Sequence, residues 1–212
     1  MMKKKLFIGV YNPSIILTYI SVFCSIVGIA HLMKSETLIS FDYMRLAIPL
    51  LIVAGVCDMF DGTVARMCKR TDVEKEFGIQ LDSLADTVSF VVFPACMLAH
   101  MANYSIVSMI IACFYTFAGI MRLGWFNVTT DTNKGFFQGL PVTLSAVIVP
   151  VFYVIFTALK ITGPAFEIAM QILFAVIGLL FILNFRLNKP DTKARIALGV
   201  LALAMIVLLF FI

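Results

Sequence analysis

Long apolar stretches separated by short polar segments make up most of the 212-residue chain. A helix needs about 20 consecutive apolar residues to cross the hydrocarbon core of a bilayer. Seven stretches approach this length, and each predicts one transmembrane helix. They lie near 13–33, 44–66, 78–102, 105–127, 140–160, 165–187 and 194–212. The pattern therefore predicts an all-α, polytopic integral membrane protein, with a single transmembrane domain over residues 1–212.

Composition agrees with this interpretation. Hydrophobic residues make up 62% of the chain and charged residues 13%, whereas soluble domains average roughly 45–50% and 25%. These values exclude a disordered chain, a nucleic-acid-coating protein and an ordinary soluble globule, and we expect no nucleic-acid partner. The five cysteines stand singly, without the spacing of a metal site, and are interpreted as small buried hydrophobes.

The placement of the basic residues predicts the orientation. If the N-terminus lies in the cytoplasm, thirteen of the sixteen Lys and Arg residues fall on the cytoplasmic side. Only Lys34, Arg45 and Lys160 fall on the other side. This distribution obeys the positive-inside rule, so we expect a cytoplasmic N-terminus.

Four aspartates lie in or at the ends of the second and third apolar stretches: Asp58, Asp61, Asp82 and Asp86. A charge inside a membrane helix costs about 2.5–3.5 kcal/mol even on the most lenient scale. The spacings i,i+3 and i,i+4 place each pair on one helix face. Because a short polar segment joins the two stretches, both pairs fall at the same cytoplasmic depth. Divalent cations relieve the repulsion of such a cluster, and a two-metal site binds phosphoryl oxygens.

Other interpretations of these polar residues stay open at this point. The aspartates equally suit a structural polar cluster or the ion site of a cation or proton transporter. In the first stretch, Asn12 suits an N-cap position and begins a segment with hydroxyl residues on one face. That face comprises Ser14, Thr18, Ser21 and Ser25, and such residues also pack membrane helices together. Pro94 interrupts the third stretch and is tolerated only if neighbours satisfy the freed backbone.

The aspartates belong to a longer motif. Residues 58–66 read DMFDGTVAR and residues 78–86 read GIQLDSLAD. Together they resemble the signature of the CDP-alcohol phosphotransferase family, D-x2-D-G-x2-A-R-x(n)-G-x3-D-x3-D, at every fixed position. The segment between Arg66 and Gly78 is longer here than in many members. The resemblance implies a membrane enzyme with a six-helix core, to which the seventh helix is an addition. It also implies a homodimer that transfers a group from a CDP-linked donor to an alcohol and releases CMP.

The resemblance also implies roles for individual residues. Asp58, Asp61 and Asp82 would bind metal, and Asp86 would bind a second ion or act as the base. The ions would be Mg²⁺ or Mn²⁺, two in number, with Ca²⁺ as a further candidate. Gly78 would allow close helix approach. The full set implied to bind the CDP-linked donor is Asn12, Thr18, Gly62, Ala65, Arg66 and Gly78.

Two later segments bear on the acceptor alcohol. Residues 121–128, MRLGWFNV, and 137–143, FQGLPVT, are similar to stretches of bacterial and archaeal phosphatidylserine synthases. That similarity implies CDP-diacylglycerol as donor, L-serine as acceptor and a location in the cytoplasmic membrane of the cell, with the active site on the cytoplasmic side. Arg122, Asn127 and Lys134 are the candidate acceptor-binding residues. Arg122 and Lys134 are equally interpreted as topology determinants.

Two alternatives remain for the function. One is the same chemistry with glycerol 3-phosphate or an inositol phosphate as acceptor. A phosphate-bearing acceptor calls for extra cations, and Trp125 stands where the synthases have a second arginine. The other alternative is a cation or proton transporter that uses the aspartate cluster. The fixed Gly, Ala and Arg positions of the motif are not needed by such a relay.

Overall fold

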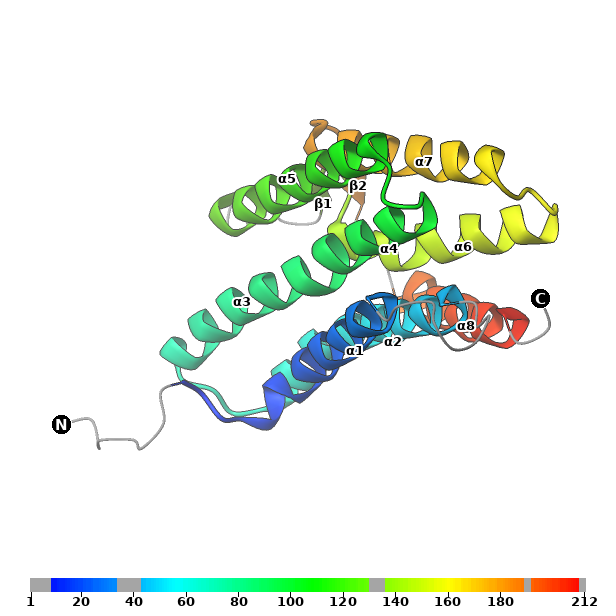
Figure 1. The fold of residues 1–212 in the computed structure, drawn as a ribbon. Helices are drawn as coiled ribbons and strands as arrows, with labels where there is room; N and C mark the ends of the chain where they lie inside the picture. The colour runs from blue at the N-terminus through cyan, green and yellow to red at the C-terminus, as the bar shows by residue number, and fades with distance from the viewer. Residues whose placement is uncertain (1–8, 34–42, 130–135, 189–191, 210–212) are drawn as a thin grey trace.

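The computed structural model describes residues 9–33, 43–129, 136–188 and 192–209. Helices dominate, which confirms the all-α expectation (Figure 1). The helices are α1 (Ile16–Leu32), α2 (Met44–Met67), α3 (Asp72–Asp86), α4 (Phe93–Met101), α5 (Ile106–Thr129), α6 (Ser145–Ala158), α7 (Pro164–Ile182) and α8 (Thr192–Leu209). Short 3-10 turns, η1 (Pro13–Ile15) and η3 (Val142–Leu144), precede α1 and α6.

A helix occupies each of the seven expected stretches. Within the described residues, five helical segments are long and apolar enough to cross a membrane. They are Pro13–Leu32, Met44–Met67, Asp72–Met101, Ile106–Thr129 and Pro164–Ile182. The chain is therefore a multi-pass membrane protein. The apolar helices Val142–Ala158 and Ala197–Leu209 are shorter, and their crossing stays a prediction.

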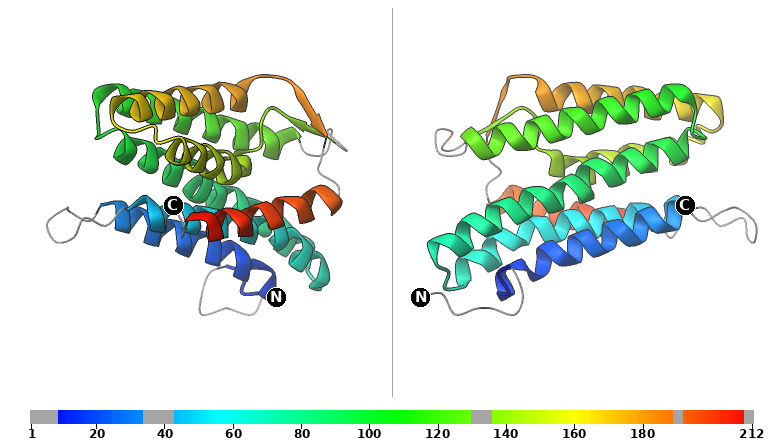
Figure 2. Two further views of the ribbon diagram at one scale, coloured as in Figure 1. Left: turned by 90° about the vertical axis from the view of Figure 1, so that its right-hand side faces the viewer. Right: turned by 60° about the vertical axis from the view of Figure 1, so that its left-hand side comes forward.

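The helices form layers that fix which segments meet. α5 and α7 form one layer, α4 and α6 the next, and α1, α2 and α8 a third (Figure 1). α1 lies along α2 over much of its length, as the turned views also show (Figure 2). Within the first layer, the ring of Tyr115 in α5 packs against those of Phe174 and Phe181 in α7, with both centroid distances 5.1 Å. This aromatic cluster belongs to the buried core.

The third helix begins earlier than the apolar pattern indicated. α3 starts at Asp72 rather than near residue 78, because Thr71 and Glu74 form a capping box. The Glu74 amide donates to Thr71 Oγ1 at 3.3 Å, and the Thr71 amide donates to Glu74 Oε2 at 2.8 Å. These bonds satisfy two backbone donors that would otherwise be unpaired at the helix start. Only residues 68–71 therefore connect α2 to α3, so the two helices are tightly linked.

α3 and α4 are joined by a π-helical segment, η2 (Thr87–Val92), into one continuous helix. Pro94 follows this segment and has no N–H to donate to the carbonyl of Phe90 four residues earlier. That carbonyl accepts hydrogen bonds from the Tyr115 hydroxyl at 2.8 Å and the Ser145 hydroxyl at 3.2 Å. Side chains of α5 and α6 thus satisfy the backbone that the proline leaves unpaired, as a membrane interior requires.

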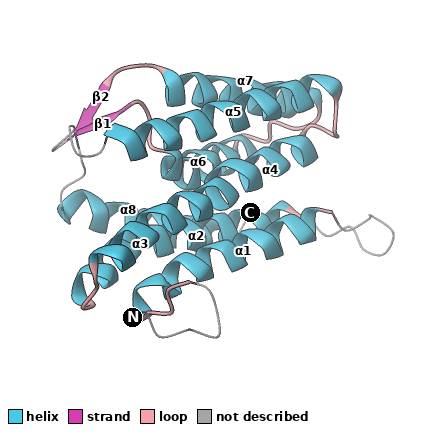
Figure 3. Ribbon diagram, turned by 90° about the vertical axis from the view of Figure 1, so that its left-hand side faces the viewer, coloured by secondary structure: helices cyan, strands magenta, loops and turns pink. Residues whose placement is uncertain are grey.

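A two-stranded antiparallel ribbon was not expected from the sequence. It pairs β1 (Phe136–Gln138) with β2 (Arg186–Asn188). Gly139 follows β1 with a φ of +67°, and a Cβ there would meet the carbonyl oxygen of Phe181 at 2.8 Å. Its amide donates to the carbonyl of Phe185 at 2.8 Å. The ribbon thereby ties the start of α6 to the end of α7, at the end of the bundle where α2 finishes and α3 begins (Figure 3).

The hydroxyl face of α1 divides into two parts. Toward the middle of the bundle, Ser21 donates to the Ser89 hydroxyl at 3.1 Å, and Ser25 donates to the carbonyl of Ser21 at 2.9 Å. The Ser21 bond links α1 to η2, as small hydroxyl residues commonly do, whereas the Ser25 bond stays within α1. Ser14 and Thr18, on the same face, lie nearer the end that carries the aspartates.

Candidate active site

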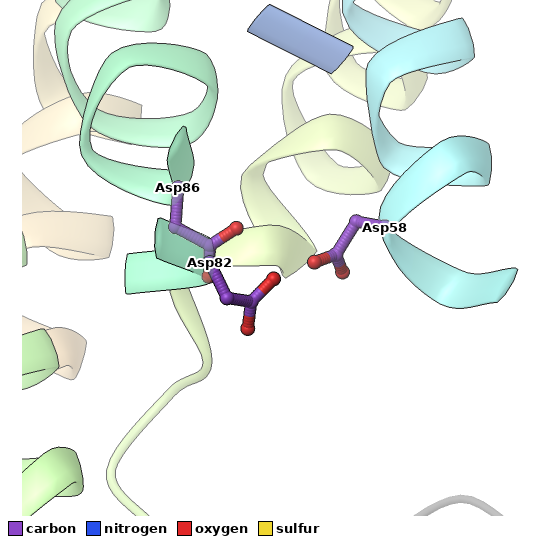
Figure 4. Close-up of side chains that lie close together, drawn as sticks. All are labelled: Asp58, Asp82 and Asp86. Carbon is purple, nitrogen blue, oxygen red and sulfur yellow. The ribbon is translucent and has the colours of Figure 1, made fainter. Parts of the chain in front are cut away.

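The four aspartates come from two antiparallel helices. Asp58 and Asp61 lie in the last turns of α2, and Asp82 and Asp86 lie near the end of α3. One carboxylate oxygen each from Asp58, Asp82 and Asp86 lies within 4.8 Å of the others. Figure 4 shows the Asp58 side chain directed from α2 toward the other two. All four side chains are half-buried.

The carboxylates contact each other in pairs across the two helices. Asp58 is within hydrogen-bonding contact of Asp86, and Asp61 is within hydrogen-bonding contact of Asp82. Asp61 is not among the three closest ligands, but Oδ2 accepts a long hydrogen bond of 3.5 Å from Thr18 Oγ1. Two carboxylates so close together need a shared proton or cation. A cluster of carboxylate oxygens fits Mg²⁺, Mn²⁺ or Ca²⁺, which are hard cations that prefer oxygen ligands.

A cavity of about 380 Å³ opens beside Asp61 and Asp82. Its lining includes all but one of the residues expected to bind the donor; the exception is Asn12. The lining residues are Ser14, Ile15, Thr18, Asp61, Gly62, Ala65, Arg66, Arg70, Lys75, Gly78, Ile79 and Asp82. We call it the donor pocket. Asn12 instead caps η1, where its Oδ1 accepts from the Ser14 amide at 3.0 Å.

The two motif glycines leave open space at the donor pocket. A Cβ on Gly62 would meet only Arg66 Nη1, at 3.6 Å, and a Cβ on Gly78 would meet only Arg70 Nη1, at 3.5 Å. The close neighbour of Gly78 is therefore an arginine side chain, rather than a helix backbone. Both distances are ordinary contacts with the mobile ends of long side chains. Arg70 and Lys75 also line this pocket and were not singled out in the sequence, because they lie outside the motif.

A second cavity of about 380 Å³ reaches the other side of the cluster, at Asp58. Its walls come from α2, from the start of α6, from the ribbon and from α8, and they are mainly apolar. Leu198 and Ala202 are the contributions of α8. α8, which occupies the seventh expected stretch, is thus part of the cavity wall beside Asp58.

Arg122 is a buried cation near the cluster. Arg122 is 7% exposed, and within the part of the chain that the structure describes its Nε and Nη2 atoms have no hydrogen-bond partner. The guanidinium carbon lies 4.9 Å from the ring centre of Phe126 and 5.9 Å from that of Phe137. Asp86 is close enough for the two opposite charges to interact. A buried guanidinium with unpaired donors is costly unless an anion binds it, which favours a ligand-binding role over a purely topological one.

The other expected acceptor residues lie in different settings. Asn127 Oδ1 accepts a hydrogen bond from the Ser83 hydroxyl at 3.0 Å, which links α5 to α3 between Asp82 and Asp86. Trp125 Nε1 donates to Gln138 Oε1 at 2.8 Å, and both residues line a cavity of about 250 Å³ with Arg122. Lys134 lies outside the described residues. The acceptor roles of all three expected residues stay predictions.

The sequence profile of the CDP-alcohol phosphatidyltransferase family matches residues 11–211. The chain belongs to this family. The resemblance found in the motif is thereby confirmed over nearly the whole chain, including the seventh helix. Members of this family are phosphotransferases that use divalent metals, and an aspartate cluster that could hold such an ion is present in this structure.

Individual relatives show which members of the family this chain is similar to. Archaetidylserine synthase of Methanothermobacter thermautotrophicus is 31% identical over 156 residues, which cover 73% of this chain and 63% of that protein. CDP-diacylglycerol–serine O-phosphatidyltransferase of Helicobacter pylori is 28% identical over 165 residues, or 76% of this chain and 68% of the relative. The enzyme of that name from Methanocaldococcus jannaschii is 32% identical over 158 residues, or 74% and 70%. The match therefore spans about two thirds of the length of these relatives.

Proposed function

We propose that the protein transfers a phosphatidyl group from CDP-diacylglycerol to L-serine, giving phosphatidylserine and CMP. The observation that carries this proposal is the position of the carboxylate cluster between the donor pocket and the buried Arg122. Asp82 belongs to the cluster and also lines the donor pocket. Asp86, from the same cluster, lies within electrostatic reach of the buried Arg122. A donor diphosphate and an anionic acceptor would therefore meet at the cluster.

The donor side has the charges that a CDP-linked lipid requires. Arg66 lines the pocket and carries a guanidinium that suits the oxygens of a diphosphate. Asp58, Asp82 and Asp86, with Asp61 in a two-ion arrangement, would hold Mg²⁺ or Mn²⁺, with Ca²⁺ as a further candidate. Such ions supply neutralisation of the charge on the transferred group and the leaving group. The bare backbone at Gly62 and Gly78 leaves room for the nucleotide.

The transfer step itself needs a nucleophile and a base. The serine hydroxyl oxygen forms a bond to the lipid-side phosphorus, and the bond from that phosphorus to the oxygen of CMP breaks. The Asp86 carboxylate accepts the hydroxyl proton, and Arg66 stabilises the departing phosphate. A correctly placed base contributes about 10²–10⁴-fold to the rate. We assign this role to Asp86 because it interacts with Arg122, the residue proposed to bind the carboxylate of the acceptor. Asp86 would therefore lie on the acceptor side of the cluster.

Arg122 supports serine over the phosphate-bearing acceptors. The serine carboxylate would accept charge-assisted hydrogen bonds from the unpaired Nε and Nη2 atoms. In the cavity that Arg122 lines, Trp125 and Gln138 are neutral and bonded to each other. Glycerol 3-phosphate or an inositol phosphate calls for more positive charge than these residues supply. The names of the three relatives differ in the lipid but share serine.

We also propose a cytoplasmic active site in a homodimer at the cell membrane. Arg66, Lys69 and Arg70 cluster at the aspartate end, whereas Arg45 and Lys160 lie at the other ends of α2 and α6. This distribution supports the orientation given by the positive-inside rule. Accessibility labelling of a cysteine placed at position 69, in sealed vesicles, would test the orientation. Crosslinking in membranes would test the homodimer.

The proposed reaction is tested by CMP release from the purified protein in detergent. CDP-diacylglycerol and Mn²⁺ or Mg²⁺ are supplied with serine, glycerol 3-phosphate, inositol phosphate or no acceptor. We expect release that depends on both serine and the metal ion. Release with a different acceptor would replace serine and leave the site assignment standing. No release by folded protein that binds the donor, together with ion flux in vesicles, would favour the transporter.

A further inference from the structure

Arg70 occupies a special position in the donor pocket although it lies outside the family motif. It belongs to the four-residue connection between α2 and α3, and its side chain is half-buried and lines the pocket. Within the described ranges, no hydrogen bond or ion pair holds its guanidinium. The capping box at Thr71 fixes the backbone immediately after it. The connection therefore presents Arg70 to the pocket from a well-defined point.

The pocket has matching walls on its two sides. On the α2 side, Arg66 Nη1 lies over the bare backbone of Gly62, 3.6 Å from the position of a Cβ. On the α3 side, Arg70 Nη1 lies over Gly78 at the corresponding distance of 3.5 Å. Each wall thus pairs one glycine with one guanidinium. A ligand between the walls would have an arginine within reach on either side.

The remaining charges around the pocket are already engaged. Lys75 Nζ forms an ion pair of 2.8 Å with Asp72. Arg66 Nη2 donates to the hydroxyl of Thr63 at 3.1 Å, a neutral partner that a phosphate would readily replace. Arg70 is therefore the most readily available cation of the three for an incoming anion. Two guanidinium groups match a diphosphate, because each forms paired hydrogen bonds with phosphate oxygens.

We propose that Arg70 is a second diphosphate-binding residue, which acts with Arg66 to hold the CDP-linked donor between the two walls. The ligand class is a nucleoside diphosphate, free or lipid-linked, and the inference rests on the proposed function for its physiological donor. It predicts that the contact is made to the diphosphate rather than to the cytidine. CDP should therefore depend on Arg70 more strongly than CMP does.

The test is equilibrium binding of CDP and of CMP to the purified full chain in detergent with Mn²⁺, measured by calorimetry for wild type and Arg70→Gln. The matched control is Lys69→Gln, which removes the same charge from the neighbouring exposed residue that does not line the pocket. We expect Arg70→Gln to weaken CDP binding at least about tenfold, the range of one lost charge-assisted contact. CMP binding should weaken less, and Arg70→Lys should restore part of the CDP affinity. The thermal unfolding midpoints confirm that the variants are folded.

Three results would overturn the inference: unchanged CDP affinity in Arg70→Gln, an equal loss in Lys69→Gln, or equal losses for CDP and CMP. Serine-dependent CMP release by wild type is measured alongside and keeps the two proposals apart. If wild type makes the product and Arg70→Gln binds CDP normally, only the role of Arg70 fails. If Arg70→Gln loses CDP affinity but no acceptor supports CMP release, the diphosphate site stands and the proposed reaction fails.

Discussion

The aspartate end and the middle of the helix bundle use the same residue types in opposite ways. At the aspartate end, Gly62 and Gly78 face open space with only arginine tips nearby. In the middle of the bundle, a Cβ on Gly119 would meet the side chain of Val91 at 2.7 Å. Glycine leaves room for a ligand in the first case and for a packed helix in the second.

Polar groups show the same contrast. In the middle of the bundle, the carbonyl of Phe90 has two donors, and Ser21 is bonded to Ser89. At the aspartate end, carboxylates face each other, and Arg122 has N–H groups without a partner among the described residues. A buried polar group that is fully paired stabilises the fold, whereas an unpaired one lowers stability unless a ligand completes it. The difference indicates which end is built for binding.

The largest effect is expected from Asp58→Asn at the aspartate end. If Asp58 binds metal as proposed, its loss removes several kcal/mol of charge stabilisation, so CMP release should fall by at least roughly 10³-fold. Without divalent ions, the variant should unfold at the same or a higher temperature than wild type, because one repelling charge is gone. Near-normal turnover would remove Asp58 from the site.

A smaller effect is expected from Arg122→Gln. The KM for serine should rise by about 10- to 100-fold, the range for a lost charged hydrogen bond, while the KM for CDP-diacylglycerol changes little. Ethanolamine, which lacks the carboxylate, is the informative comparison, because its use should not depend on Arg122. Steady-state kinetics with both acceptors make the measurement. If the KM for serine and the KM for CDP-diacylglycerol rose by the same factor, Arg122 would only support the fold.

The two glycine environments predict opposite stability changes. Gly119→Ala should destabilise the protein by about 1–3 kcal/mol, since the new methyl group overlaps a stiff valine in a packed core. Gly78→Ala should be neutral or stabilising by up to about 1 kcal/mol, because alanine is the better helix former. Thermal or denaturant unfolding in detergent compares the pair. Equal losses for both variants would erase the proposed distinction.

The smallest effect is expected from Tyr115→Phe. It removes one of two donors to the Phe90 carbonyl, so the loss should be about 1 kcal/mol. Adding Ser145→Ala leaves that carbonyl unpaired, and the double variant should lose more than the sum of the single variants. Unfolding measurements on the four proteins complete the cycle. Strict additivity would mean that the two hydroxyls do not share this role.

Much of the architecture follows from local patterns in the sequence. Apolar length locates the seven helices, and spacing predicts that the aspartates of α2 and α3 meet. The early start of α3 can also be predicted from the sequence, because Thr71 and Glu74 have the spacing of a capping box. The apolar pattern alone missed it, since the first turns of α3 are polar.

Other features depend on contacts between distant residues and left no such signal. β1 and β2 are three residues each, and their pairing joins segments separated by two helices. The availability of Arg70 depends on the partners that Arg66 and Lys75 find nearby. The orphaned state of Arg122 depends on the burial that α5 and its neighbours create. Composition and spacing indicate which residues are candidates, but three-dimensional packing decides which of them are paired.

The most direct test follows isotope-labelled serine into lipid. Wild type and Asp58→Asn are each incubated with CDP-diacylglycerol, labelled serine and Mn²⁺, with and without a chelator, and the extracted lipids are analysed by mass spectrometry. Labelled phosphatidylserine should form only with wild type in the presence of the metal ion, in amounts equal to the CMP released. Formation of the labelled lipid by Asp58→Asn at the wild-type rate, or its absence from folded wild type that binds the donor, would contradict the account.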